Sequence, residues 1–238
     1  MDRDKTVESY LFTSDKELVA ERVTEMGRKT VSALKKSMEA FVNCNLDLVG
    51  TILEEDNKID AMDEEIDLEC LRSIAMRQPV REELRFIFAM LKTTTDLERI
   101  GDHAVNIAHQ TANLGKRANT EADSVLLDML DIAAAMLRDA LIALRTSDGD
   151  SSEEICRRDG VLDMLYERVT HSLIEFAASR ETKDSALMRV IFAQMMVARD
   201  LERVGDHCTN IAERVYFVAK GKNLAKEAST KEAGKAAS

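Results

Sequence analysis

The chain contains one sequence twice. Residues 96–108 read DLERIGDHAVNIA and residues 200–212 read DLERVGDHCTNIA, with 10 of 13 positions identical at a spacing of 104 residues. The correspondence extends backwards at the same spacing, from RFIFA at 85–89 to RVIFA at 189–193. Solenoid repeats are only about 20–50 residues long. A unit of about half the 238-residue chain therefore predicts a tandem duplication.

The composition favours helices in both copies. One proline, nine glycines and no tryptophan leave a chain rich in residues with high helix propensity. A net charge of −11 argues against nucleic acid as the main partner. No apolar run approaches the ~20 residues of a membrane span, and the N-terminus lacks a signal-peptide pattern. The cysteines form no CxxC pair, so we expect reduced thiols in a cytoplasmic protein: Cys44, Cys70, Cys156 and Cys208.

Hydrophobic periodicity predicts six long helices and no strand. Ser14 and Glu17 resemble a capping box that opens the first helix, and Pro79 suits the first turn of the third. Gly115 predicts the end of that third helix, and Ser151 or Ser152 a cap for the fifth. The expected helices span residues 14–48, 50–76, 80–113, 121–146, 151–179 and 184–219.

The expected fold is all-α, with two three-helix bundles packed side by side. The pattern Leu34, Met38 and Phe41 recurs 103 residues later as Leu137, Leu141 and Leu144. The expected divisions are an N-terminal segment at 1–14, a first bundle at 15–116, a second at 117–219 and a lysine-rich disordered tail at 220–238.

Acidic residues form stripes along these helices. Positions i, i+4 and i+8 share one face of a helix, so Glu98, Asp102 and Asn106 form an oxygen-bearing stripe. The apolar stripe of that helix lies over a quarter turn away. Gly101 lies between the two stripes and predicts a close approach by another group. The second copy repeats the arrangement with Glu202, Asp206 and Asn210 beside Gly205.

The preceding helix of each copy carries a matching stripe. Asp56, Asp60, Asp63 and Asp67 recur at helical spacing, next to an apolar face of Ile59, Met62 and Ile66. The fifth helix keeps Asp159 and Asp163, but Tyr166 and Thr170 replace the later aspartates. Carboxylates that converge need protonation or a cation, and Mg²⁺, Mn²⁺ or iron suits oxygen ligands.

The neighbours of these stripes have other expected roles. His103 and His207 lie about 100° round the helix from Asp102 and Asp206. This favours packing, a surface position or support of the ligands over direct metal ligation. Arg99 and Arg203 either pair with the adjacent acids or face solvent. Asp96 and Asp200 point away from the stripes, and we do not place them among the ligands.

The two DLER-x-GDH segments, with DxxxD upstream in each half, resemble the duplicated signature of the PhoU family over residues 15–219. The resemblance implies two three-helix bundles with multinuclear clusters of iron, or of zinc, magnesium or manganese. The implied metal positions are Asp56, Asp60, Glu98, Asp102 and Asn106, and in the second unit Asp159, Asp163, Glu202, Asp206 and Asn210.

The resemblance also implies a function. Family members act as negative regulators of phosphate uptake and of the phosphate-starvation response. They bridge the ATPase subunit of a phosphate ABC transporter and a membrane-bound sensor histidine kinase. We therefore expect a non-enzymatic adaptor, a homodimer, that meets the membrane only through these partners. In agreement, the residues offer no evident nucleophile and no glycine-rich phosphate loop.

Three alternatives remain open at this point. A carboxylate-bridged metalloenzyme of the ferritin-like type needs Glu-x-x-His, which the chain lacks. A regulatory module of a sodium–phosphate cotransporter would normally accompany membrane spans. A purely structural bundle would keep its fold without metal.

Overall fold

The computed structural model describes residues 2–114, 121–179 and 184–224. These residues form six long helices with no strand among them, which confirms the predicted fold class. The elements are α1 (Asp2–Val42), α2 (Asp47–Arg77), α3 (Glu82–Gln110), the 3-10 helix η1 (Thr111–Asn113), α4 (Glu121–Thr146), α5 (Ser152–Ala178) and α6 (Ser185–Lys220). The predicted stop at Gly115 and residues 225–238 of the predicted tail lie outside the described residues.

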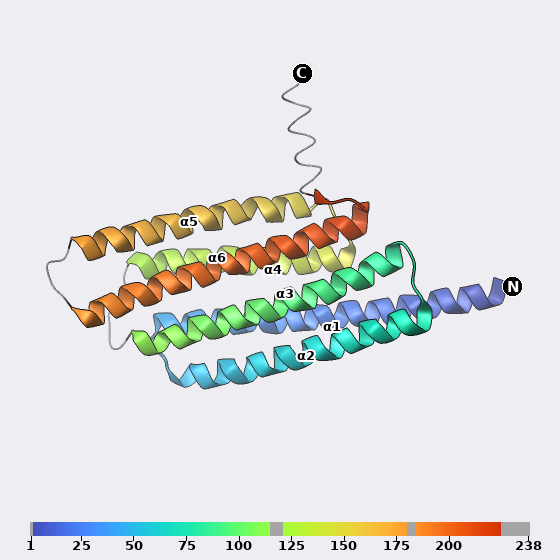
Figure 1. The fold of residues 1–238 in the computed structure, drawn as a ribbon, viewed down its shortest axis with the longest axis horizontal. Helices are drawn as coiled ribbons and strands as arrows, with labels where there is room; N and C mark the ends of the chain where they lie inside the picture. Colours follow the sequence, from blue (N-terminus) through green and yellow to red (C-terminus); the bar gives the residue numbers. More distant parts are fainter. Residues whose placement is uncertain (1, 115–120, 180–183, 225–238) are drawn as a thin grey trace, which may run out of the picture.

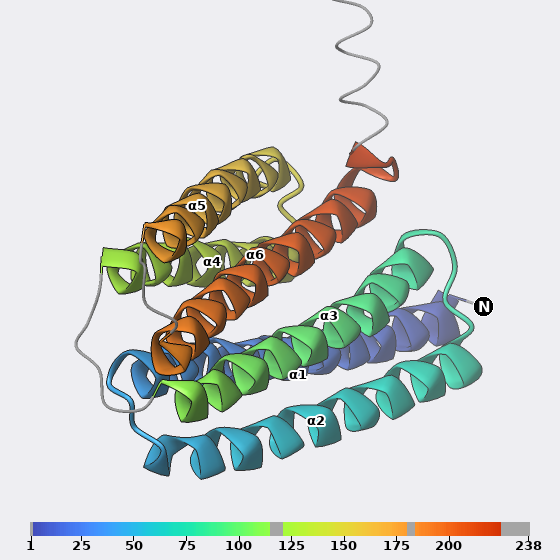
Figure 2. The same cartoon turned by 60° about the vertical axis from the view of Figure 1, so that its left-hand side comes forward.

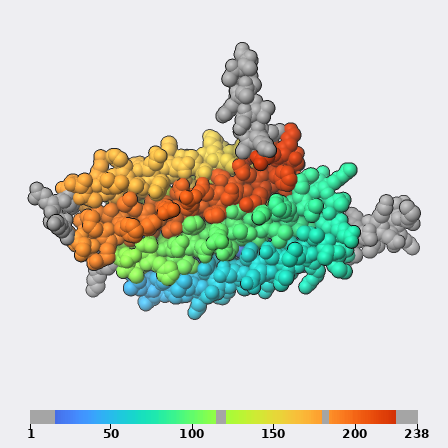
Figure 3. Space-filling view, in the orientation of Figure 1, coloured from blue at the N-terminus to red at the C-terminus, as the bar shows by residue number. Residues whose placement is uncertain are grey.

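The helices lie in two layers (Figure 1). The helices α2, α3, α6 and α5 run side by side in one layer, and α1 and α4 pack behind them. Figure 2 shows that α1–α3 form one bundle and α4–α6 the other, with α3 and α6 adjacent at the centre. In the space-filling view the first layer forms four neighbouring bands (Figure 3). The two carboxylate stripes expected in each unit thus lie on neighbouring helices of one layer, α2 and α3 in the first unit and α5 and α6 in the second.

The apolar periodicity accounts for the core. Leu34, Met38 and Phe41 of α1 are fully buried, and their counterparts on α4 are at most 6% exposed. One continuous cluster of buried side chains runs through both bundles. Where α1 crosses α4, Gly27 allows close contact, because a Cβ there would collide with the Leu141 side chain. The duplicated bundles are therefore two halves of a single packed body.

Two predicted helix starts are wrong. The first helix begins at Asp2 and continues through Ser14, so the proposed capping box lies in a helix interior. No proline or glycine interrupts residues 2–13, and nothing there forces a break. Pro79 lies in the connection before α3 rather than in its first turn. Gln78 and Arg81 have positive φ angles of 48° and 53°, so helical backbone resumes only at Glu82.

The caps of the second bundle also differ in part from expectation. The fifth helix begins at Ser152 as predicted, but neither serine caps it: the Ser151 hydroxyl lies 2.5 Å from Asp148 Oδ2. Asp184 does cap α6, where its carboxylate accepts from the backbone N–H groups of Ala186 and Leu187. No helix among the described residues is long and apolar enough to cross a membrane.

Candidate metal centres

The first carboxylate stripe lies where α2 packs against α3. The apolar face of α3 is fully buried at Leu97 and Ile100, and Ile59 of α2 is equally buried. This packing brings Asp56 onto the bare backbone of α3. A Cβ added to Gly101 would lie 2.7 Å from Asp56 Oδ1. The predicted close approach at Gly101 is confirmed, and the group that approaches is a carboxylate.

The second unit repeats this geometry between α5 and α6. A Cβ added to Gly205 would lie 2.5 Å from Asp159 Oδ1 and 2.6 Å from Leu162 Cδ1. Two glycines at equivalent positions thus each admit one aspartate of the neighbouring helix. A helical glycine costs about 1 kcal/mol relative to alanine. At both positions the glycine leaves room for the close approach of the aspartate.

The carboxylates of each cluster repel one another. Burial raises the pKa of Asp56 from 3.8 to about 6, with added repulsion from Asp60, Asp102 and Glu98. Burial and then Asp102 also raise the pKa values of Asp60 and Glu98. These four side chains therefore share one electrostatic environment, although they come from two helices.

The second cluster has the same electrostatics. The pKa of Asp159 rises from 3.8 to about 6 through burial, and then through Asp163, Asp206 and Glu202. The pKa of Glu202 is raised mainly by burial, and Asp206 adds to the effect. The structure thus groups eight of the ten predicted metal positions into two sets of four.

Arginines partly neutralise each cluster. Arg99 Nη1 lies 3.0 Å from Asp102 Oδ2, and its Nε lies 3.3 Å from Glu98 Oε2. Arg203 makes the equivalent contacts in the second unit, 3.0 Å to Asp206 and 3.7 Å to Glu202. Of the two expected roles for these arginines, the structure shows pairing with the adjacent acids. The most buried aspartates of the two clusters, Asp56 and Asp159, receive no arginine partner among the described residues.

One buried carboxylate oxygen in each cluster is the best evidence that the clusters suit a cation. Asp56 Oδ1 and Asp159 Oδ1 are buried and have no hydrogen-bond partner among the described residues. A buried carboxylate oxygen without a donor is costly, and a bound cation would remove that cost. As the side chains lie, no three acidic, histidine or cysteine side chains of the described residues enclose a metal ion. The donor set is nevertheless all oxygen, which suits hard cations.

The stripe on α2 is longer than the stripe on α5. Asp63 and Asp67 continue it, and each has a buried oxygen without a hydrogen-bond partner among the described residues. Burial and the nearby Asp63 raise the pKa of Asp67. The equivalent positions on α5 carry Tyr166 and Thr170. The two units therefore offer different numbers of carboxylates.

The two asparagines of the predicted set are not grouped with the carboxylates. Asn106 and Asn210 are both exposed. The Asn210 amide donates to Asp96 Oδ1 at 3.4 Å, so it faces the other unit. Ligation by either asparagine remains a prediction.

The contact between α3 and α6 contains two crossed histidine–aspartate pairs. His207 Nδ1 lies 2.8 Å from Asp96 Oδ1, and His103 Nδ1 lies 2.9 Å from Asp200 Oδ1. The imidazole ring centroids are 5.7 Å apart. The antiparallel packing of two equivalent helices makes the pairs reciprocal. The expected packing role of the histidines is confirmed, but their partners could not be predicted, because they belong to the other copy.

The two pairs differ in their surroundings. Asp96 is 5% exposed and also forms an ion pair with Arg214. The residue equivalent to Arg214 in the first unit is Gln110, and in the described part of the chain Asp200 pairs with no guanidinium. Burial lowers the pKa of His207 and also lowers that of Arg214 to about 10. The junction between the two bundles, where α3 meets α6, thus carries more charged groups around Asp96 than around Asp200.

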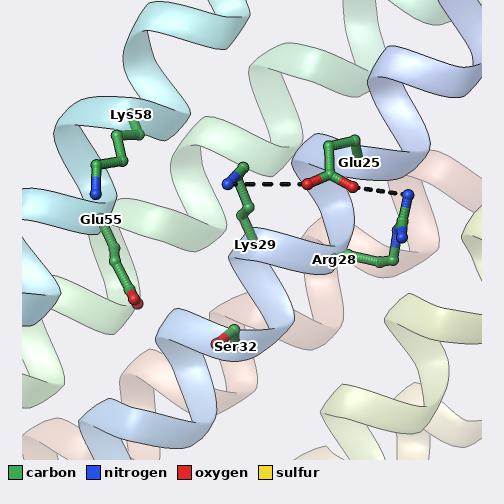
Figure 4. A pocket seen from close by; sticks show the side chains of 6 residues that line it. All are labelled: Glu25, Arg28, Lys29, Ser32, Glu55 and Lys58. Carbon is green, nitrogen blue, oxygen red and sulfur yellow. Dashed lines mark ion pairs between the residues drawn. The ribbon is translucent and has the colours of Figure 1, made fainter.

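A polar groove of about 290 Å³ between α1 and α2 has a different character (Figure 4). Glu25 pairs there with Arg28 at 2.7 Å and Lys29 at 3.8 Å. Glu55, which also lines the groove, pairs with Lys36. Its acids are already matched by bases, so it lacks the carboxylate excess of the two clusters.

The four cysteines are core thiols, and one of them neighbours the second cluster: burial and then Asp159 raise the pKa of Cys208. All four are free, with Cys70 and Cys208 buried and Cys44 and Cys156 half-buried. Burial raises the pKa of Cys70 to about 12 and that of Cys156 to about 11. Thiols with such pKa values stay protonated and act as core side chains.

Comparison with known proteins identifies the same duplication. The model of the PhoU domain matches residues 23–111 and again residues 126–215. A phosphate-specific transport system accessory protein PhoU homolog from Clostridium acetobutylicum is 33% identical over 215 residues, 90% of this chain and 96% of its own. A protein of the same name from Zymomonas mobilis is 34% identical over 202 residues, 85% of this chain and 84% of its own.

Solved structures agree with the fold. The crystal structure of PhoU from Pseudomonas aeruginosa superposes with a TM-score of 0.81 at 28% identity, covering 89% of this chain and 100% of that one. The phosphate transport system regulatory protein PhoU from Streptococcus pneumoniae has a TM-score of 0.82 at 23% identity, covering 90% and 99% of the two chains. Two domain matches, full-length relatives and the fold agree, and the chain belongs to the PhoU family.

Proposed function

We propose that this chain is a regulatory accessory protein of phosphate transport, which represses phosphate uptake and the phosphate-starvation response. The observation that supports this most strongly is the paired placement of the two DLER-x-GDH segments, each beside an aspartate stripe of the neighbouring helix. Relatives that match nearly the whole chain are named as accessory proteins of the phosphate-specific transport system. The protein acts by binding, and its partners are the transporter ATPase subunit and a sensor histidine kinase.

The carboxylate clusters are proposed to hold metal ions. Asp56, Asp60, Glu98 and Asp102 would bind in the first unit, and their four counterparts in the second. The metal would supply positive charge that offsets the repulsion within each cluster. Asp56 and Asp159 would be the inner anchors, because their buried oxygens have no other partner among the described residues. Occupied clusters would fix α2 on α3 and α5 on α6, and so define the outer surface of that layer.

A double substitution tests the metal clusters. We expect Glu98→Ala with Asp102→Ala to abolish metal binding in the first unit, while the helical circular-dichroism signal survives. The equivalent change in the second unit is Glu202→Ala with Asp206→Ala. Metal content is measured by plasma mass spectrometry after dialysis against each candidate ion, iron, zinc, magnesium and manganese.

The matched control removes two acids from the same helix outside the cluster, Glu82→Ala with Glu83→Ala. It lowers the net negative charge of α3 equally but leaves the stripe intact. If metal content is unchanged in the cluster variant, or falls equally in the control, these carboxylates are not the ligands.

A reporter strain tests the regulatory role. We expect a deletion strain grown in ample phosphate to switch on a phosphate-starvation promoter, and the wild-type chain to switch it off again. Restoration by the control variant and not by the cluster variant would tie repression to the clusters. Reporter output that stays low in the deletion strain would count against a repressor of this response.

The proposed partners are tested by reconstitution. The purified transporter ATPase subunit and the cytoplasmic part of the kinase would each be passed over immobilised chain, with and without metal. Retention of both supports an adaptor. If neither is retained in any metal state, the bridging role is wrong even if the reporter responds. The oligomeric state follows from light scattering of the same preparations, where we expect a homodimer.

A further inference from the structure

The second bundle contains an apolar pocket that the proposed regulatory function does not use. It has a volume of about 330 Å³ and lies between α4, the C-terminal half of α5 and the start of α6. Val125, Val169, Leu173 and Ile191 line it and are at most 9% exposed. Gln194, 2% exposed, is a buried polar group in the same wall. This volume lies at the lower end of the range for small-molecule pockets.

The equivalent place in the first bundle is filled. Residues of α6 correspond to residues of α3 at a spacing of 104, so Val190 and Gln194 correspond to Phe86 and Met90. Phe86 is 3% exposed and Met90 is fully buried, and both belong to the core. The pocket in the second bundle arises because these two larger side chains are replaced.

The surface above this place also differs between the bundles. In the first, Arg22 of α1 pairs with Glu65 at 2.9 Å and with Glu69 at 3.3 Å across α2. At a spacing of 103 residues the counterparts of these three residues are Val125, Arg168 and Ser172, which all line the pocket. In the described part of the second bundle, the ion pairs that cover this place in the first have no equivalent.

Among the described residues, Arg168 is therefore a cation without a counter-ion. It lines the pocket from an exposed position on α5, and it forms no ion pair or hydrogen bond with any described residue. Glu121 is the one acid in the lining, and it lies in the first turn of α4, where the helix dipole partly offsets its charge. Gln194 is oriented by a hydrogen bond from its Nε2 to the buried Asp123 Oδ1 at 3.0 Å. The pocket thus combines an apolar interior with a guanidinium at its edge that pairs with none of the described residues.

We propose that this pocket binds a small molecule with an apolar body and a single anionic group, such as an acyl carboxylate. The apolar body would replace the side chains that fill the first bundle. Arg168 stands at the position of Glu65, so the anionic group would lie where the Arg22 guanidinium lies in the first bundle, and would pair with Arg168. This site is independent of the carboxylate clusters and of the regulatory role.

The test uses the full chain and a defined set of probes. Decanoate, decanol and decyltrimethylammonium share one alkyl body and differ only in the charge of the head group. Calorimetric titration gives the affinity of each probe, and methyl NMR locates it through Val125, Leu173 and Ile191. We expect decanoate to bind at least tenfold more tightly than the other two and to shift these pocket methyls. Equal affinities, tighter binding of the cationic probe, or shifts elsewhere would overturn the proposal.

Two substitutions that transplant first-bundle residues sharpen the test. Val190→Phe fills the pocket and leaves the Gln194–Asp123 bond in place, so we expect loss of decanoate binding with no loss of thermal stability. Arg168→Glu should weaken decanoate at least tenfold and change decanol less than twofold. Arg72→Glu, the same charge change on α2, is the control and should leave both affinities unaltered. Decanoate binding that persists in the folded Val190→Phe chain would show that the pocket is not the site.

Discussion

The two units of this chain share an ion pair at one kind of site and the sign of the charge at another. In the first unit Lys36 of the first helix pairs with Glu55 of the second. The corresponding positions of the second unit carry Asp139 and Arg158, which also pair, at 2.6 Å, with the charges exchanged. At such a site the interaction matters and the sign does not, since either arrangement places opposite charges together.

The carboxylate clusters behave in the opposite way. All four cluster positions carry an acid in both units, although the carboxylates of each cluster repel one another. Exchanging one acid for a base would relieve that repulsion, yet neither unit has done so, although the charges of the Lys36–Glu55 pair are exchanged in the second unit. This contrast favours a requirement for negative charge that comes from outside the fold, as a bound cation would impose.

The junction between the units offers the sharpest test of their difference. We expect Asp96→Ala to lower the free energy of unfolding by about 3 kcal/mol, because it leaves the half-buried Arg214 and His207 without their acid. Asp200→Ala should cost about 1 kcal/mol, because Asp200 pairs with His103 alone among the described residues. Urea denaturation at pH 7 measures both. Equal losses would mean that the charge asymmetry of the junction carries no energetic weight.

The two cluster glycines should also respond unequally. A methyl group at Gly205 would meet both Asp159 and the Leu162 side chain, whereas at Gly101 it would meet only the Asp56 oxygen at short range. We expect Gly205→Ala to destabilise the metal-free chain by about 2 kcal/mol through overpacking. Gly101→Ala should be near neutral, because the aspartate can turn away and alanine favours the helix. Thermal unfolding in chelator gives the comparison, and a larger loss at Gly101 would contradict it.

The fold could be predicted from sequence because its signals are local. The periodicity of Leu34, Met38 and Phe41 recurs in α4, and it describes the buried face of each helix correctly. Helix ends were less predictable. The Ser14 capping pattern is also compatible with a helix interior, and the connection at Pro79 depends on positive φ angles at Gln78 and Arg81 that neither residue type demands.

The site was predictable where it depends on one helix and not where it depends on packing. The stripes and the close approach at Gly101 follow from spacing along a single helix. The reciprocal pairs of His103 and His207 depend on how the two units meet, which spacing does not encode. The pocket in the second bundle is a further case, because it results from side chains that are smaller than their counterparts, such as Val190 against Phe86.

The smallest expected effect is a pH dependence shared by the two clusters. The pKa values of Asp56 and Asp159 rise from 3.8 to about 6 on folding, so between these values the native state binds more protons than the unfolded state. The free energy of unfolding of metal-free protein should therefore fall as pH rises from about 4 to about 6, by about 1 kcal/mol after allowance for solvent screening.

Substitution separates the contributions of the two clusters. We expect Asp56→Asn and Asp159→Asn each to remove about half of that fall, because the two aspartates have matching environments. His207 has a lowered pKa and contributes with the opposite sign, but it is present in both variants and cancels in their comparison. Denaturant titrations in chelator at pH 4, 5, 6 and 7 measure the effect. If only one variant reduces the pH dependence of the free energy of unfolding, the two clusters are electrostatically unequal. The negative charge that they share would then need a separate cause in each unit.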